Sequence, residues 1–252
     1  MSAFGVIASC ATSSEVTRSE HAAEAGQPVE PLAGDPPAAV SKGPNGTPVP
    51  AEDSGDLGDA GGADAAAVDP YVGLVINEVD YDQLGTDDRE FVELFNDSGH
   101  AVDLDGLAVV VATAATEYGR VDLTGVLAAR GYAIVASPKV VIAADAGVVR
   151  FPWNAATNNL RNTAPAAIGI LDTVNGELVD ALSYNGSVTS AVVTDVPDPV
   201  SFVEGNATSI VDSNTVEQSL IRNPNGTDTD DATADWKVTK TVTPGSANQL
   251  TP

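Results

Sequence analysis

The chain has 252 residues, and 36 Asp and Glu against 11 Lys and Arg give it a formal net charge of −25. This charge repels nucleic-acid phosphates, so we expect no binding of DNA or RNA through the overall field of the protein. The single cysteine, Cys10, excludes an intramolecular disulfide and any zinc site that requires two thiolates.

Residues 1–10 carry a pattern typical of an export signal. They are mostly apolar, and the sequence Ile7-Ala8-Ser9 places small residues directly before Cys10. The segment resembles the lipobox of bacterial lipoproteins, which implies that Cys10 is acylated. Ala11 follows in place of Asp, which resembles lipoproteins that are passed on to the outer membrane.

This segment also departs from a complete secretory signal, because no Lys or Arg precedes Cys10 and the apolar stretch is short. Either the true signal begins upstream of Met1, or the match is a coincidence. We favour the first interpretation, since the only cysteine of the chain falls at this place and a polar segment follows it.

Residues 11–70 consist largely of Ala, Gly, Pro, Ser, Asp and Glu. Pro36-Pro37 and Gly61-Gly62 interrupt any regular element. Such a segment cannot bury enough apolar surface to offset the entropy lost on ordering. It is therefore predicted to be a disordered acidic tether between an anchor at Cys10 and a folded domain over residues 71–252.

From residue 71 onward, short β-branched runs alternate with turn residues, which predicts an all-β, antiparallel β-sandwich. Asn175-Gly176 predicts a hairpin with a two-residue type I′ turn. In the run from Glu90, period two separates Phe91 and Phe95 from Val92 and Leu94, and two apolar faces indicate a central strand. The expected strands are 73–81, 90–96, 107–112, 132–136, 167–172, 178–184, 216–222 and 236–239.

Two groups of motifs at the ends of this region suggest a family. Ile76-Asn-Glu-Val-Asp80, Glu90-Phe-Val-Glu-Leu-Phe-Asn96 and Val102-Asp-Leu-Asp-Gly-Leu107 open it, and Ser219-Leu-Ile-Arg222 and Thr243-Pro-Gly-Ser-Ala-Asn248 close it. Together they resemble the bacterial lamin-tail domain over about residues 74–248. The resemblance implies an immunoglobulin-like sandwich, found on secreted bacterial proteins and often beside nucleases or phosphoesterases. The family motif residues are Glu78, Glu90, Glu93, Asn96, Gly106, Pro244 and Gly245.

Catalytic constellations are weak in this sequence, and we expect no enzyme. The histidines are His21, in the tether, and His100, beside a turn, so a Ser-His-Asp site lacks support. Glu78, Glu90 and Glu93 could pair for glycoside hydrolysis, but we expect them to accept hydrogen bonds from the backbone or Arg89 inside the sandwich.

A hard cation is the one cofactor that the sequence suggests, although none is required. Ca²⁺ prefers six to eight oxygen ligands, and two loops are dense in aspartate without following EF-hand spacing. The alternative is that these aspartates cap turns. The candidate ligands are Asp80, Asp82, Asp87 and Asp88 in the first loop, and Asp228, Asp230, Asp231 and Asp235 in the second.

These features together predict a lipoprotein of the outer membrane or cell surface whose domain is a binding or structural module. Its expected partner is a protein or a cell-envelope polymer, and only the lipid contacts the membrane. Trp153 and Trp236 are expected to pack in the core, although Trp153 in an exposed loop would suit carbohydrate or protein contact. The alternatives are an accessory domain of a secreted metal-dependent nuclease or phosphoesterase system and a calcium-dependent adhesion module.

Overall fold

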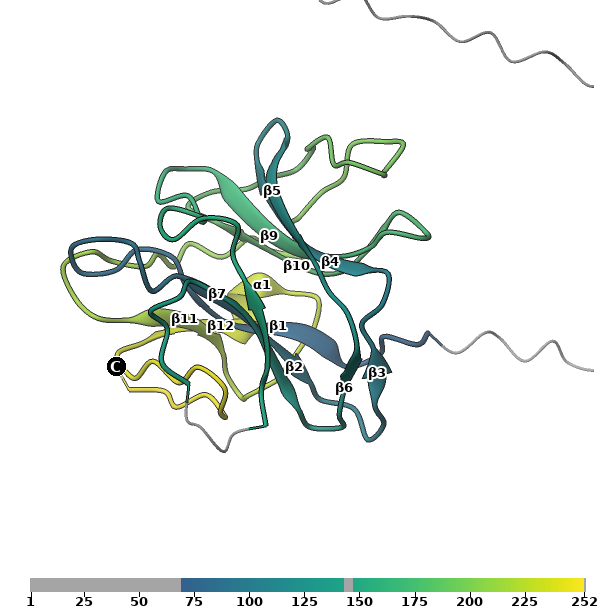
Figure 1. The fold of residues 1–252 in the computed structure, drawn as a ribbon. Coiled ribbons are helices and arrows are strands. Elements are labelled where there is room, and N and C mark those ends of the chain that lie inside the picture. Colours follow the sequence, from purple (N-terminus) through teal and green to yellow (C-terminus); the bar gives the residue numbers. More distant parts are fainter. Residues whose placement is uncertain (1–68, 143–146, 252) are drawn as a thin grey trace, which may run out of the picture. The chain divides into compact units, whose positions relative to one another are not determined.

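Two stacked β-sheets enclose the main hydrophobic core, as Figure 1 shows. The structure is a computed structural model, and it describes residues 69–142 and 147–251. The predicted anchor at Cys10 and nearly all of the predicted tether lie outside the described residues. Within the described part, no helix has both the length and the apolar character needed to cross a bilayer.

The larger sheet has six strands and joins the beginning of the described chain to its end. Its neighbours pair antiparallel except β7 and β8, which are parallel and thereby depart from the expected all-antiparallel arrangement. The connection over residues 137–148 is long enough for the crossover that a parallel pair needs. The order is β12 (Trp236–Thr239), β11 (Ser219–Arg222), β1 (Leu74–Asp80), β2 (Phe91–Asn96), β7 (Tyr132–Ala136) and β8 (Val149–Pro152).

The smaller sheet has four strands, and a separate two-stranded ribbon and a single helical turn complete the described part. The order in the smaller sheet is β10 (Glu177–Tyr184), β9 (Ala166–Asp172), β4 (Leu107–Thr113) and β5 (Glu117–Asp122). The ribbon pairs β3 (Val102–Asp103) with β6 (Val126–Leu127), and the turn is α1 (Ala232–Asp235).

All eight expected strands are present, with boundaries that differ by up to three residues. The sequence pattern missed β3, β5, β6 and β8. Two of these strands are only two residues long, β5 is a polar edge strand with mostly half-buried residues, and β8 contains a proline. Periodicity carries little signal in such strands.

The predicted β9–β10 hairpin is present, but its turn is wrong in detail. Asp172 pairs with Glu177, so four residues rather than two connect the strands. Gly176 has a positive φ of 72°, whereas Asn175 is not among the positive-φ residues. The Asp172 carboxylate accepts hydrogen bonds from the backbone N–H groups of Val174 and Asn175, which stabilises the longer turn.

Both faces of each sheet carry apolar clusters, which explains the nearly continuous apolar runs of β4 and β9. In β2, Val92 and Leu94 face the main core, whereas Phe91 packs on the opposite side with Ile134 and Val140. The prediction of a central strand with two apolar faces is therefore confirmed. The outer face of the smaller sheet packs against residues 188–202, where Phe202 is fully buried.

Candidate functional site

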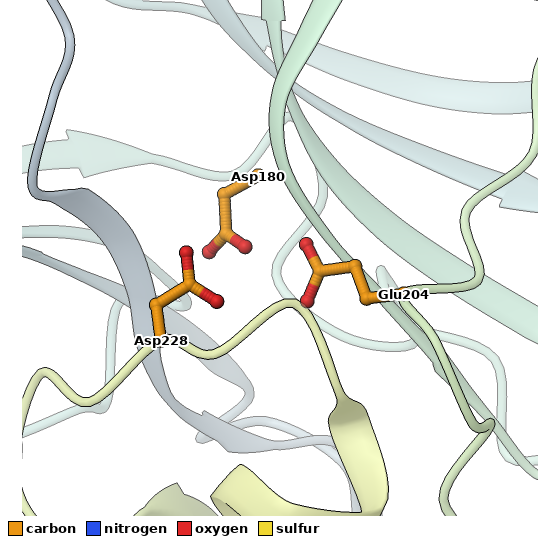
Figure 2. Close-up of side chains that lie close together, drawn as sticks. All are labelled: Asp180, Glu204 and Asp228. Carbon is orange, nitrogen blue, oxygen red and sulfur yellow. The ribbon is translucent and has the colours of Figure 1, made fainter.

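Three carboxylates from distant parts of the chain converge beside the sandwich, as Figure 2 shows. Asp180 belongs to β10, Glu204 to the long segment that precedes β11, and Asp228 to the loop before α1. One oxygen atom from each lies within 4.8 Å of those of the other two. By geometry alone, this acidic cluster could hold a cation.

A side chain of the protein already supplies the positive charge. The fully buried guanidinium of Arg222 donates to Asp180 at 2.6 Å and to Glu204 at 3.3 Å through Nη2. Its Nη1 donates to Asp228 at 3.1 Å and to Asp235 at 3.0 Å. A metal ion in the acidic cluster would have to displace this arginine or lie against it.

The surroundings of Arg222 hold it firmly. Its Nε donates to the carbonyl of Ile76 in β1, and its guanidinium carbon lies 5.2 Å from the ring centroid of Trp236. Burial lowers the pKa of Arg222, but the surrounding carboxylates more than offset this and leave it raised. Burial raises the pKa of Asp180, and the charge of Arg222 opposes that increase.

The aspartates of the second loop make separate structural contacts and do not converge on one point. Asp235 bonds Arg222 and the N–H and hydroxyl of Thr229. Asp231 is the N-cap of α1 and accepts from Thr233 and Ala234. Asp230 is exposed at a positive φ of 54°, and its N–H bonds Asp228. These contacts match the alternative that the aspartates cap turns.

The aspartates of the first loop also have separate partners. Asp82 and Asp87 both accept from the side-chain amide of Asn162, at 2.8 and 2.7 Å. Asp88 pairs with Lys139 on the surface. Asp80 is nearly fully buried at the end of β1 and accepts from the amide of Gln83 at 2.6 Å.

Asp80 and Asp212 form a buried pair of interacting carboxyl groups. Burial, with the charge of Asp212, raises the pKa of Asp80 to about 8. Burial also raises the pKa of Asp212 to about 7, although it accepts backbone hydrogen bonds from Tyr81, Asp82 and Ser213.

Two motif glutamates connect the first strands to the closing Thr-Pro-Gly turn. Glu78 accepts from the N–H and hydroxyl of Thr243 and from Ser219. Glu93 accepts from the N–H of Gly245 at 2.6 Å. Burial raises the pKa of both glutamates, and these hydrogen bonds oppose the increase.

The turn that contains Pro244 and Gly245 depends on the glycine. Ser246 donates its N–H to the carbonyl of Thr243, which closes a β-turn. Gly245 has a φ of 87°, as the third position of a type II turn requires, and a Cβ there would lie 2.8 Å from Val148. A side chain at residue 245 would therefore strain the turn that Glu93 holds.

Asn96 and Gly106 support turns near the ribbon of β3 and β6. The buried Asn96 amide donates to the carbonyls of His100, Leu127 and Ala128. Gly106 has a φ of 86°, and its carbonyl accepts from Thr173 in the β9–β10 turn.

Glu90, the third motif glutamate, fixes the loop between β8 and β9. Its carboxylate accepts from the backbone N–H of Asn159 at 2.7 Å and of Leu160 at 2.9 Å, and from the Asn159 amide. The expected contact between these glutamates and Arg89 is replaced by a surface pair of Arg89 with Glu217. Glu90, Asp82 and Asp87 thus all hold the loop between β8 and β9.

This loop forms the wall of a groove that we call the asparagine groove. Three adjoining hollows of about 510, 360 and 220 Å³ share lining residues, with Asn162 common to the first two and Tyr118 and Asn158 common to the last two. Asn154, Asn159 and Asn185 also line them. No Asp or Glu of the described residues is among their lining residues.

Aromatic and basic groups complete the groove. The guanidinium carbon of Arg161 lies 4.8 Å from the ring centroid of Tyr118, whose hydroxyl accepts the Arg161 N–H. No ion pair among the described residues includes Arg161. Trp153 and Trp236 are both buried, as expected, and Trp153 lines the smallest hollow.

Sequence reasoning missed both Arg222 and this groove. An arginine in a strand as short as Ser219-Leu-Ile-Arg222, in a chain so rich in acids, was a signal for a buried ionic cluster. The signal for the groove was the density of asparagine in Trp153-Asn-Ala-Ala-Thr-Asn-Asn-Leu-Arg-Asn162.

Replacing Arg222 should strongly destabilise the protein. Arg222→Met leaves the buried carboxylates of Asp180 and Asp235 without their cation, so we expect the free energy of unfolding to fall by about 3–5 kcal/mol. Chemical denaturation of the full chain measures this. The control Arg89→Met, at an exposed pair, should cost less than about 1 kcal/mol. Equal effects of the two substitutions would refute the role of Arg222.

Stability should decrease as the pH rises from about 5 to 9. An aspartate in the unfolded chain has a pKa of about 3.9, whereas the native pKa values of Asp80 and Asp212 are about 8 and about 7. Between these values the native state binds more protons than the unfolded state, so the free energy of unfolding falls as the pH rises. Asp80→Asn should reduce the slope of melting temperature against pH, whereas the exposed Asp122→Asn should not. A melting temperature that increases over this range would contradict the assignment.

Comparison of the sequence with known protein families identifies the domain that contains β1 to β10. Residues 68–186 match the model of the family described as Lamin Tail Domain. Among curated proteins, none matches the chain. The matched residues include β1 to β10, and β11 and β12 complete the same six-stranded sheet beyond the match. The chain thus contains a lamin tail domain, folded as an immunoglobulin-like β-sandwich.

Proposed function

We propose that this protein is a non-catalytic surface lipoprotein whose lamin tail domain binds a polymer of the cell envelope in the asparagine groove. The observation that carries the proposal is the groove itself, three hollows that share lining residues and have polar, aromatic and basic lining. Concave sites with a few well-placed polar groups are the usual form of binding sites in proteins.

The wall of the groove is held in place before any ligand arrives. Glu90 accepts two backbone N–H groups of the wall, and Asn162 is fixed between Asp82 and Asp87. Asn185 donates to the carbonyl of Asn162, which connects the two sides. A preorganised site loses less conformational entropy on binding, which favours affinity.

The distribution of acidic groups supports binding over catalysis. Glu78, Glu93 and Asp180 have raised pKa values, but they accept backbone hydrogen bonds in the interior and do not line the groove. A general acid must lie within hydrogen-bond reach of its substrate. The Ser98 hydroxyl bonds Asn96 and the His100 carbonyl, a turn contact that does not use the imidazole.

The anchor in this proposal rests on the likeness of Ile7-Ala-Ser-Cys10 to a lipobox. We expect the protein, expressed from its native locus, to incorporate an alkyne-tagged fatty acid and to partition into the membrane fraction. Cys10→Ala should abolish both, whereas Ser9→Ala, which keeps a small residue before the cysteine, should retain both. Mass spectrometry that finds an N-terminal peptide with a free Cys10 thiol would refute the anchor.

Blocking the groove should abolish binding to the envelope. Ser209 is exposed and lines the largest hollow, so Ser209→Trp should fill it without disturbing the core. We expect saturable co-sedimentation of the full chain with insoluble envelope material, and a loss of at least about tenfold in affinity for Ser209→Trp. The exposed Ser190→Trp is the matched control. Equal binding by both variants would place the binding surface elsewhere.

A further inference from the structure

We propose that the ligand of the asparagine groove is a neutral polysaccharide chain. This inference rests on the proposed binding function and names the chemical class of its ligand. The side-chain N–H groups of Asn154, Asn158 and Asn162 donate within the protein, whereas their side-chain oxygens accept no hydrogen bond from the described residues and can accept from the hydroxyl groups of a ligand. Asn158 and Asn162 lie where the hollows join, and Thr163 and Ser209 add hydroxyls.

The electrostatics of the groove favour an uncharged ligand. Its lining contains no carboxylate of the described residues, in a chain with 36 acidic side chains, and Asp82 and Asp87 beside it already accept hydrogen bonds from the Asn162 amide. A cationic ligand would have to compete with that amide for them. A polyanion would be repelled by the net charge of −25. A neutral chain with many hydroxyls fits both conditions.

Another hollow of the domain shows that this neutrality is specific to the groove. A hollow of about 420 Å³ beside Tyr71 is lined by Asp69, Asp172 and Glu177. The asparagine groove has no acid among its lining residues and is lined by amides, hydroxyls and arginines instead.

Arg161 and Trp153 supply the strongest single contacts. The guanidinium of Arg161 is exposed and lies over Tyr118, so its remaining N–H groups can bond ligand oxygens. Trp153 is 7% exposed and lines the smallest hollow, and its indole N–H has no hydrogen-bond partner among the described residues. A hydroxyl at the inner end of the groove would satisfy that donor.

A peptide bound by strand addition fits the groove less well. An added strand needs free backbone groups on the outer edge of β5. There the N–H of Glu117 already bonds the carbonyl of Val192, and the carbonyl of Arg120 accepts from Asn154. Side chains rather than backbone groups therefore contact the ligand, as they would with a sugar chain.

The test is calorimetric titration of the full chain with soluble polysaccharides. The neutral probes are dextran, mannan, xylan and fully N-acetylated chito-oligosaccharides, and the acidic probes are alginate and polygalacturonate. We expect saturable binding of at least one neutral probe. Arg161→Ala should weaken it by about tenfold or more, and Arg89→Ala, an exposed arginine outside the groove, should not change it.

Two other outcomes would overturn the ligand class and leave the proposed function standing, and a third would overturn both. Binding to envelope material that survives periodate oxidation of its sugars but not protease treatment would assign the groove to a protein. Tighter binding of alginate than of every neutral probe would refute neutrality. If neither the polysaccharides nor the envelope material bind, both the ligand class and the proposed function fail.

Discussion

The buried guanidinium of Arg222 connects most parts of this domain. From β11 it reaches Asp180 in the opposite sheet, the carbonyl of Ile76 in β1, Asp235 in α1 and two acids in the long loops. Placing one arginine and several carboxylates in the interior is costly in solvation energy, and the cost is offset only when every charge finds its partners. The two sheets and the loops must therefore adopt their native positions together.

A second set of polar contacts connects the ends of the described chain. Glu78 and Glu93, in the first two strands, accept hydrogen bonds from Thr243 and Gly245 near the end. The sheet order also places an early strand beside a late one, because β1 lies between β11 and β2. The matched family residues end at 186, so the last two strands extend the lamin tail domain through contacts that its own glutamates make.

Acidic side chains also shape the proposed binding site by holding its wall in place. Glu90, Asp82 and Asp87 hold the backbone and the amide of the groove wall, and none of them lines the hollows. A very acidic protein thus presents a groove lined by amides, hydroxyls and arginines, with no carboxylate of the described residues among its lining. The carboxylates of Asp82 and Asp87 lie beside the groove, and the protein as a whole carries a net charge of −25, so a polyanion would be repelled. The proposed neutral polymer is compatible with both observations.

The sequence by itself determined the sandwich, because period two and turn residues are local signals, strong in the long apolar strands and weak in the short or polar ones. It also marked Glu78, Glu90 and Glu93 as interior groups, since a carboxylate in a strand with two apolar faces needs partners. It did not determine the partners. Asp180, Glu204 and Asp228 are far apart in the chain, and only the packing of two sheets brings them to Arg222. The groove likewise exists only because β5, the β8–β9 loop and the segment before β11 meet in space, and no local pattern encodes that meeting.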